Sequence, residues 1–300
     1  MLHRRTDLAV EAAQLWRESA GESTKLEGVE ARESLREGFP VTTVRILNAR
    51  GAKALGKPVG TYVTLDLSAL IRRENDAFGR AARALAGELR TLLGLPAGAP
   101  ALVVGLGNRA ITPDAVGPLA AEHILATRHL VEGLPAQFGH FRPVAALAPG
   151  VLGTTGVESG ELVGAVSRQV EPACVVAVDA LASRSLHRLC TTVQLSDTGI
   201  VPGSGVGNAR AVLNRDSLGI PVVAVGVPTV VDGATLACDL LEEAGHSTLD
   251  PQTLQGAGDL MVTTRDIDAR VADMGKVIGM GLNLALQTGM TVEELTGLMD

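Results

Sequence analysis

Aromatic residues are scarce in this chain: phenylalanine, tyrosine and tryptophan together make up 2% of its 300 residues. Apolar residues of all kinds still amount to 46%, so the core must be aliphatic, built from valine, leucine, isoleucine and alanine. A chain of this length forms either one large α/β domain or two ordinary ones.

Cysteines and long apolar runs are also few. Cys174, Cys190 and Cys238 are odd in number and widely spaced, with no C-x-x-C pair, so we expect buried free thiols in a reducing cytoplasm. No apolar run reaches the roughly 20 residues of a membrane span, and residues 1–7 are charged where a signal peptide would become apolar. We therefore expect a cytoplasmic protein without a membrane partner.

Positive charge is in the minority, because 33 acidic residues face 26 basic ones and the net charge is −7. Such a chain repels phosphate backbones, which argues against direct binding of nucleic acid. A basic partner suits this charge better.

Residues 1–98 are predicted to form an N-terminal helix and β-hairpin region that packs on the core. The segment 19–38 is polar, whereas 41–47 and 61–67 are rich in β-branched residues and are expected to pair as a hairpin. A helix is predicted from Phe78 to Leu92, where apolar residues recur at helical spacing.

Residues 99–300 are predicted to form an α/β catalytic core with a C-terminal helix, the whole chain being one structural domain. The expected strands are 101–106, 144–148, 174–178, 191–195 and 221–227, and the expected helices are 114–132, 158–170, 205–214, 230–245 and 265–287. Nearly continuous apolar strands alternating with amphipathic helices indicate a mostly parallel sheet with helices on both faces. Residues 246–263 have the composition of a linker.

Two aspartates stand where such a fold builds its site. Asp114 follows the first apolar strand of the core, and Asp179 ends the apolar run that starts at Cys174. They lie 65 residues apart, which leaves room for an intervening helix, strand and helix, so that adjacent parallel strands bring both to one edge of the sheet. If they meet, one carboxyl can hold a proton while the other stays ionised, which is the arrangement needed for acid/base chemistry.

Each aspartate alone also has a purely structural interpretation. Thr112 can cap a helix that begins at Pro113, which makes Asp114 an acidic residue in a first helical turn. Asp179 can equally act as a helix N-cap or open a turn.

Further candidates for the pocket lie in loops that follow the predicted strands. They are Asn108, Gly153, Glu158, Asp197, Gly205, Asn208, Thr229 and Asp232. Glu158, Thr229 and Asp232 are equally suited to cap helices. The glycine-rich loops 149–156 and 202–208 lack the P-loop ending Gly-Lys-Ser/Thr and match the dinucleotide fingerprint poorly, so their backbone amides are expected to hold a peptide or an oxyanion, unless they are only tight turns.

Other catalytic motifs are weak or missing. Asp197-Thr-Gly matches the triplet of pepsin-like proteases, but that fold requires two triplets on β-rich lobes, so Asp197 is interpreted as a residue of the pocket rim. His123 and His129 do not share a helical face, and neither a His-Glu-x-x-His nor a Gly-x-Ser-x-Gly motif occurs. We predict no metal ligands and no cofactor.

Ordered segments over most of the chain resemble the germination protease of endospore-forming bacteria. These segments are Arg5-Thr-Asp-Leu-Ala-Val-Glu-Ala, Val104-Gly-Leu-Gly-Asn, Thr112-Pro-Asp-Ala-Val-Gly-Pro, Pro149-Gly-Val-Leu-Gly-Thr-Thr-Gly, Val178-Asp-Ala-Leu-Ala-Ser-Arg-Ser, Ser196-Asp-Thr-Gly-Ile-Val-Pro-Gly-Ser-Gly-Val-Gly-Asn, Val225-Gly-Val-Pro-Thr-Val-Val-Asp and Leu260-Met-Val-Thr.

This resemblance implies an endopeptidase that starts the degradation of small acid-soluble spore proteins when a spore germinates. It implies a homotetramer in the spore core, made as a zymogen, and an atypical aspartic mechanism carried by Asp114 and Asp179. It also implies a core fold similar to that of hydrogenase-maturation proteases, of the phosphorylase/hydrolase-like type, in which the corresponding acids bind nickel.

The chain departs from the family in two places. Only residues 1–4 precede the Arg-Thr-Asp motif, where the family has a longer leader, so we expect either a minimal trim or control other than that of a conventional zymogen. The segment between Asp232 and Leu260 is shorter than the family's usual insertion. Three alternatives stay open: a metal-dependent maturation-type endopeptidase, a catalytically silent binding protein of the same fold, and nucleotide binding at the glycine loops.

Overall fold

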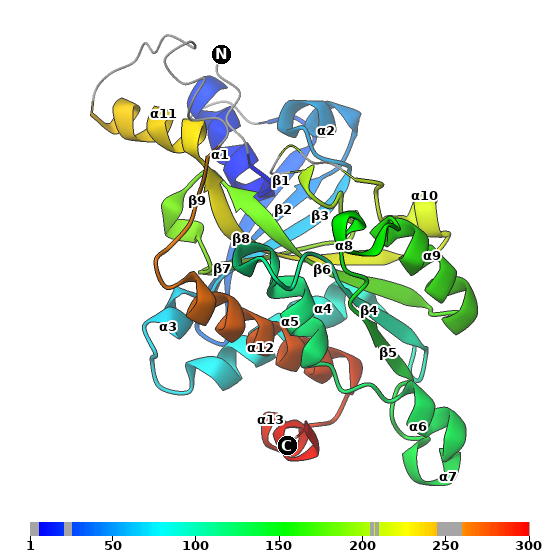
Figure 1. Ribbon diagram of the computed structural model, residues 1–300. Helices are drawn as coiled ribbons and strands as arrows, with labels where there is room; N and C mark the ends of the chain where they lie inside the picture. Colours follow the sequence, from blue (N-terminus) through cyan, green and yellow to red (C-terminus); the bar gives the residue numbers. More distant parts are fainter. Residues whose placement is uncertain (1–5, 21–25, 205–206, 208–209, 245–259, 300) are drawn as a thin grey trace.

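The computed structural model describes residues 6–20, 26–204, 207, 210–244 and 260–299. Within these residues nine strands form a single mixed sheet in the order β1-β2-β3-β7-β8-β6-β4-β5, with β9 paired to β8 (Figure 1). The strands are β1 (Val29–Arg36), β2 (Phe39–Ile46), β3 (Gly60–Asp66), β4 (Ala101–Gly105), β5 (Val144–Leu147), β6 (Cys174–Ser183), β7 (Thr192–Ser196), β8 (Val222–Asp232) and β9 (Met261–Val262).

Helices cover both faces of the sheet, which confirms the predicted α/β class. The α-helices are α1 (Ala9–Ala20), α2 (Ala49–Leu55), α3 (Ser68–Ile71), α4 (Ala77–Leu93), α5 (Val116–Glu122), α6 (Arg128–Gly133), α7 (Pro135–Phe138), α8 (Leu152–Thr155), α9 (Ser159–Val170), α10 (Arg215–Leu218), α11 (Gly233–Glu243), α12 (Ile267–Leu286) and α13 (Val292–Met299). Two 3-10 turns are η1 (Thr112–Asp114) and η2 (Leu186–Arg188). No helix in the part of the chain that the structure describes is long and apolar enough to cross a membrane.

Parallel pairing is confined to one half of the sheet. β4 pairs in parallel with β5 and β6, and β6 pairs in parallel with β8. The strand expected at residues 191–195 of the parallel core is β7, and it is antiparallel to both β3 and β8. The N-terminal strands join the core through the β3–β7 pairing, so a boundary at residues 98 and 99 crosses a continuous sheet.

Alternate side chains of the central strands pack into two aliphatic layers. Val103, Val176 and Val225 face a cluster with α4, α5 and α12, whereas Leu102 and Val175 face a smaller cluster with Val163 of α9. The period of two along each strand produces this separation. All three cysteines are buried, and Cys174 and Cys190 belong to the larger of these two clusters.

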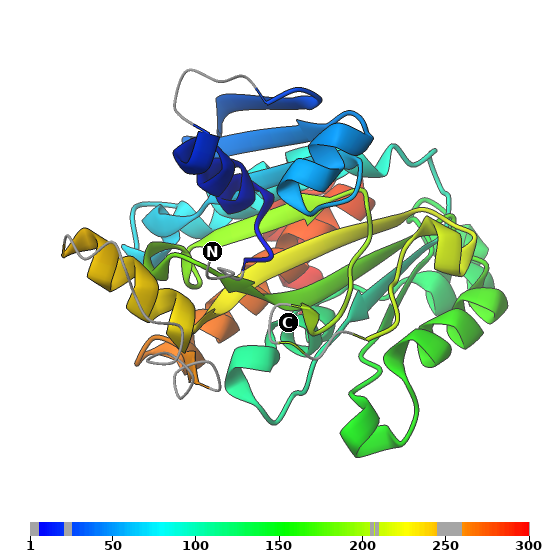
Figure 2. The same cartoon turned by 90° about the horizontal axis from the view of Figure 1, so that it is seen from above.

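The N-terminal region packs on the sheet through a third apolar cluster. Ala9 and Ala13 of α1 contact Val44 and Ile46 of β2 and Tyr62 of β3. The predicted hairpin of residues 41–47 and 61–67 is confirmed, and α2 lies in the connection between its two paired strands. Figure 2 shows α1 and α2 side by side over β2 and β3.

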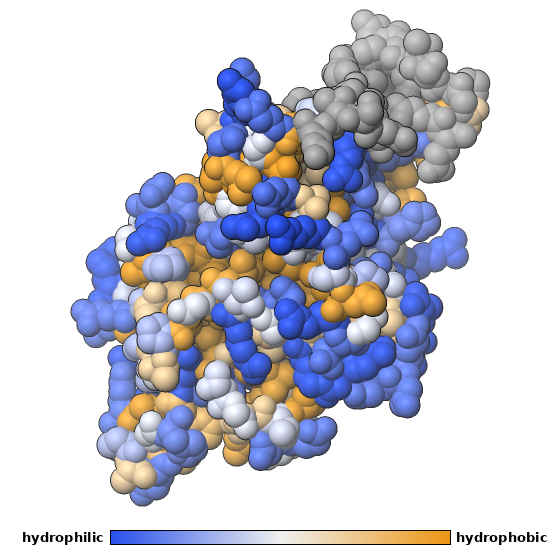
Figure 3. Space-filling model, turned by 180° about the vertical axis from the view of Figure 1, so that it is seen from behind, coloured by the Kyte–Doolittle hydropathy of each residue, from blue (hydrophilic) through white to orange (hydrophobic). Residues whose placement is uncertain are grey.

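On the side opposite to Figure 1, hydrophobic residues gather across the middle, bordered by hydrophilic ones (Figure 3).

Some predicted helices are wrong. The span 114–132 is divided into η1, α5 and α6, because the backbone of Leu125 donates to Asn283 Oδ1 and that of Thr127 to the Val144 carbonyl, which draws the chain out of the helix. The span 205–214 lies partly outside the described residues, and its residues 210–214 are not helical, since Leu213 instead bridges to Ile200. β6 and β8 also run further than expected, to Ser183 and Asp232.

Candidate active site

A cavity of about 320 Å³ lies where β4 ends while β6, which pairs with it, and β8, on the other side of β6, continue. Pairing between β4 and β6 stops at Gly105 and Val178, so Asp179 is the first residue of β6 beyond the end of β4. Ligand sites of open α/β sheets lie at such carboxyl ends of parallel strands. The cavity lining includes Asp7, Gly107, Asp114, Val151, Leu152, Glu158, Asp179, Ala182, Gly203, Arg210, Thr229 and Met261.

Asp179 is the most buried acid of this cavity, with 4% of its surface exposed. It stands inside β6 rather than at the strand end, and its Oδ1 accepts a 2.9 Å hydrogen bond from the backbone N–H of Ala180. Burial raises the pKa of Asp179 well above its usual range, and the negative charge of Asp114 raises it further. The Ala180 N–H only partly offsets this, and the charge of Asp7 adds to it. The neutral form of Asp179 is therefore favoured.

Asp114 faces the same cavity from η1. Its Oδ2 accepts a 2.7 Å hydrogen bond from the backbone N–H of Asn108, in the loop that follows β4. Burial raises the pKa of Asp114, but this backbone donor opposes the rise because it stabilises the carboxylate. The predicted cap at Thr112 is wrong, since its hydroxyl donates to Asp268 Oδ1 at 2.8 Å and caps no helix.

The two carboxyl groups thus share one cavity in unequal environments. Ionising both places two negative charges in a poorly solvated space, so the first ionisation opposes the second. Each carboxyl accepts one backbone hydrogen bond, but Asp179 is more deeply buried than Asp114, so its charged form is the less favourable of the two. Such a pair can supply an ionised base and a neutral acid together.

Two more of the predicted residues line this cavity. Glu158 lies 3.4 Å from Arg210, measured from Oε1 to Nη1, and both side chains are about one-third exposed at 33% and 38%. Thr229 is 1% exposed, and within the described structure its buried hydroxyl has no hydrogen-bond partner. A buried hydroxyl without a partner is costly unless water or a ligand binds it.

The remaining candidates are placed elsewhere. Asn108 contributes its backbone to Asp114 while its side chain accepts from Ala110 N–H, and Gly153 lies in α8 outside the lining. Asp197 does not line the cavity and accepts from the Thr61 N–H at 2.8 Å. Asp232 accepts from Thr235 at the start of α11, and it too is outside the lining. Gly205 and Asn208 lie outside the described residues.

Comparison with known proteins now identifies the family. The germination protease family model matches residues 9–246. The chain belongs to the germination protease family. Proteins named germination protease from Caldanaerobacter subterraneus and Clostridium perfringens are 43% and 41% identical to it, each covering 98% of both chains. One from Bacillus cytotoxicus is 36% identical and covers 94% of this chain and 93% of its own. The family resemblance is confirmed, and the chain is a peptidase of spore germination.

A solved structure is also similar. The [NiFe] hydrogenase maturation protease HycI from Thermococcus kodakarensis matches with a TM-score of 0.37 and 18% identity, over 65% of this chain and 98% of its own.

Sequence reasoning missed two charged residues of the cavity. Asp7 belongs to the N-terminal motif that carried the family resemblance, and that motif was the available signal. No sequence feature marked Arg210 as a cavity residue, because it lies in a segment that was predicted to be helical.

Among the described side chains there is no group of three or more His, Cys, Asp or Glu residues arranged to hold a metal ion. Burial raises the pKa of both Cys174 and Cys190 to about 12, so these thiols stay protonated.

Proposed function

We propose that this peptidase is an endopeptidase that begins the degradation of small acid-soluble spore proteins, and that Asp114 and Asp179 perform the hydrolysis as a pair. The observation that carries the mechanism is that both carboxyls line one cavity and that the charge of Asp114 disfavours ionisation of Asp179. The family membership supports the substrate class, since small acid-soluble proteins are the substrates that the resemblance implies.

The proposed reaction begins with one proton on the pair. The ionised carboxyl, for which we take the less buried Asp114, removes a proton from water as the water oxygen attacks the peptide carbonyl carbon. Neutral Asp179 donates its proton to the carbonyl oxygen. When the tetrahedral intermediate collapses, its C–N bond breaks and the departing amine takes a proton from the aspartate pair. A hydroxyl group of the intermediate then gives its proton to the pair, which again holds one proton. The apparent pKa values belong to the pair and not to either residue.

Other cavity residues are suited to hold the peptide. The hydroxyl of Thr229, which has no partner among the described residues, can donate to a peptide carbonyl or to the attacking water. Arg210 and Glu158 stand together in the lining, where they can meet polar side chains of the substrate.

The test uses Asp114→Asn and Asp179→Asn, which keep the shape of each side chain but cannot exchange the required proton. Asp216→Asn is the matched control, because Asp216 is an exposed residue of α10 outside the cavity. With a purified small acid-soluble spore protein, each cavity variant should lose about 10²- to 10⁴-fold in kcat/KM while the control cleaves normally. Cleavage by both cavity variants at the wild-type rate would refute the mechanism. A wild-type protein that leaves the spore protein intact would refute the substrate.

The remaining family expectations are part of the same proposal. The resemblance implies a homotetramer that resides in the spore core and is controlled as a zymogen. Sedimentation analysis of the purified protein tests the tetramer, and mass measurement before and after sporulation tests the trimming of its N-terminus.

A further inference from the structure

The pairing of β6 with β8 is interrupted by a bulge beside the active-site cavity. Leu181 of β6 pairs with Pro228 of β8, and the next residue, Ala182, pairs with Val230. Thr229 is therefore an extra residue of β8 without a paired residue on β6. A bulge turns a side chain out of the regular alternation of its strand, and bulges are frequent next to active sites. Here the bulged residue is one that lines the cavity.

Hydrogen bonds from two other segments hold the backbone of the bulge. The backbone N–H of Cys190 donates to the carbonyl of Pro228 at 2.7 Å. The hydroxyl of Thr263, directly after β9, donates to the carbonyl of Thr229 itself, also at 2.7 Å. Because both carbonyl groups are bonded, the backbone that carries the Thr229 side chain has a defined position.

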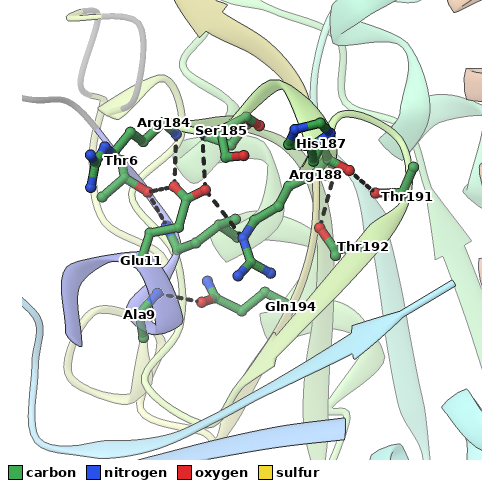
Figure 4. A network of polar contacts seen from close by, with 12 residues as sticks. Thr6, Ala9, Glu11, Arg184, Ser185, His187, Arg188, Thr191, Thr192 and Gln194 are labelled. Atoms are coloured by element: carbon green, nitrogen blue, oxygen red, sulfur yellow. Dashed lines mark hydrogen bonds and ion pairs between the residues drawn. The ribbon is translucent and has the colours of Figure 1, made fainter. Parts of the chain in front are cut away.

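The loop that contains Cys190 is in turn held against α1. The backbone N–H groups of Arg184 and Ser185 donate to the Glu11 carboxylate at 2.7 and 3.1 Å, and Arg188 Nε lies 3.3 Å from Glu11 Oε1. Glu11 is 2% exposed, and Figure 4 shows its carboxylate at the centre of these contacts. Buried contacts outside the cavity thus stabilise the loop that supports the bulge.

The hydroxyl of Thr229 is available for a ligand. Among the described residues that line the cavity, Ser159 and Thr229 are the two with a hydroxyl side chain. The hydroxyl of Ser159 donates to the carbonyl of Gly150 at 2.9 Å. The hydroxyl of Thr229 is buried and has no partner in the described part of the chain. Since a buried hydroxyl without a partner is costly, we expect it to bind a group that enters the cavity.

The proposed reaction needs a further hydrogen-bond donor at the peptide carbonyl oxygen. The aspartate pair holds one proton, so only Asp179 can donate to this oxygen while Asp114 accepts from water. The backbone N–H groups of Asn108 and Ala180 are already bound to the two carboxyls. A fixed donor in a poorly solvated site stabilises the negative charge that develops on such an oxygen. The hydroxyl of Thr229 is suited to this position, because it is neutral and lies in the same lining.

We propose that Thr229 is a catalytic residue whose hydroxyl donates a hydrogen bond to the peptide carbonyl oxygen as that oxygen becomes negative. The hydroxyl keeps its own proton, and the proton that reaches the carbonyl oxygen comes from Asp179. The hydrogen bond strengthens between the bound peptide and the transition state, because the acceptor gains charge. This inference rests on the proposed paired-aspartate function and adds a third group to it.

The test measures kcat and KM separately for cleavage of a purified small acid-soluble spore protein. Thr229→Val keeps the shape of the side chain but removes the hydroxyl, so kcat should fall about 10- to 100-fold while KM changes little. Because a threonine hydroxyl does not titrate in this range, both limbs of the pH profile should keep their wild-type positions. Thr229→Ser restores the hydroxyl and should recover most of the lost kcat.

Stability measurements separate this role from a structural one. The urea midpoint of Thr229→Val should equal or exceed that of the wild type, because the substitution removes a buried hydroxyl that has no partner in the described structure. Thr127→Val is the matched control, since Thr127 is also buried but its hydroxyl donates to the Arg142 carbonyl outside the cavity. The control should lower the urea midpoint and keep the wild-type kcat. If Thr229→Val does not fold, Thr229→Ala provides the variant without a hydroxyl.

The contrary results are distinct. A variant without the Thr229 hydroxyl that keeps the wild-type kcat overturns the inference. A rise in KM alone also overturns it, because the hydroxyl would then only hold the bound peptide, and so does a loss of kcat that Thr229→Ser shares. These results leave the paired mechanism intact. Wild-type cleavage by Asp114→Asn and Asp179→Asn would instead refute the pair, whatever Thr229 does.

Discussion

The backbone N–H of Asn108 donates a 2.7 Å hydrogen bond to the carboxylate of Asp114, so the loop after β4 folds back onto the aspartate that follows it. Gly107 makes this approach possible. Its φ is +112°, and a Cβ at this position would lie 2.1 Å from the Asp114 carbonyl oxygen. The position of Asp114 thus depends on the absence of a side chain at Gly107.

Gly107→Ala should displace Asp114 and lower kcat/KM by about 10²-fold, because a shift on the order of 1 Å is enough for such a loss. Gly98→Ala is the matched control: its φ is +70°, but nothing lies within 4 Å of the added Cβ. The control should cost only the left-handed strain of about 1–2 kcal/mol in stability and keep full activity. Equal activity of the two variants in the cleavage assay would contradict this view of the loop.

Asp179→Asn should stabilise the fold at neutral pH although it lowers kcat/KM. The pKa of Asp179 is raised in the folded protein, so the folded state binds this proton more tightly than the unfolded chain. The stability that this proton gives the folded state is fully present below the pKa of Asp179 in the unfolded chain. It is lost as the pH rises towards the pKa of Asp179 in the folded protein, at up to about 1.4 kcal/mol per pH unit. Urea unfolding at several pH values should show that the free energy of unfolding of the variant, relative to that of the wild type, increases as the pH rises. A constant difference would mean that Asp179 ionises normally.

Glu11→Gln should destabilise the protein by about 1–3 kcal/mol, because buried donors from the segment after β6 lose a charged acceptor. Glu27→Gln is the control, since the Glu27–Arg50 pair is exposed, at 71% and 76% of the side-chain surfaces, and should contribute less than about 1 kcal/mol. Urea midpoints provide the measurement. A Glu11 variant as stable as the control would show that these contacts do not hold α1 to the segment after β6.

Gly279→Ala should destabilise the contact between α12 and α5. A Cβ on Gly279 would lie 2.5 Å from His123 Cβ and 3.2 Å from the backbone carbonyl oxygen of Ala120 in α5, which cannot easily move. The expected loss is about 1–3 kcal/mol. Gly297→Ala in α13 meets nothing within 4 Å and should stabilise the helix by about 0.5–1 kcal/mol. Thermal unfolding of both variants should therefore give shifts of opposite sign, and shifts of the same sign would contradict the packing.

The sequence was informative where burial imposes a local pattern. The apolar runs at β4, β6 and β8 are continuous because helices cover both faces of the parallel strands, and the hairpin of β2 and β3 follows from alternation. β1 was missed because Glu30, Arg32 and Glu33 are exposed at the edge of the sheet, so no apolar period marks the strand.

What the sequence did not reveal depends on contacts between distant residues. The break after α5 is stabilised by Asn283, which no local pattern around Leu125 can show. Asp7 enters the cavity through hydrogen bonds to Ala182, 175 residues away. Asp114 and Asp179 were proposed from strand context because parallel strands end at one edge of a sheet, and both line the one cavity there.

The protonation state of Asp179 in the intact protein is the decisive quantity. Aspartate can be labelled with carbon-13 at its carboxyl group, and the Asp179 signal assigned by its loss in Asp179→Asn. We predict that this signal keeps the protonated position at a pH at which exposed aspartates have ionised, and that it titrates at lower pH in Asp114→Asn, because removing that charge eases ionisation. An Asp179 signal that titrates together with the exposed aspartates, and that Asp114→Asn leaves unchanged, would show that the two acids share no proton.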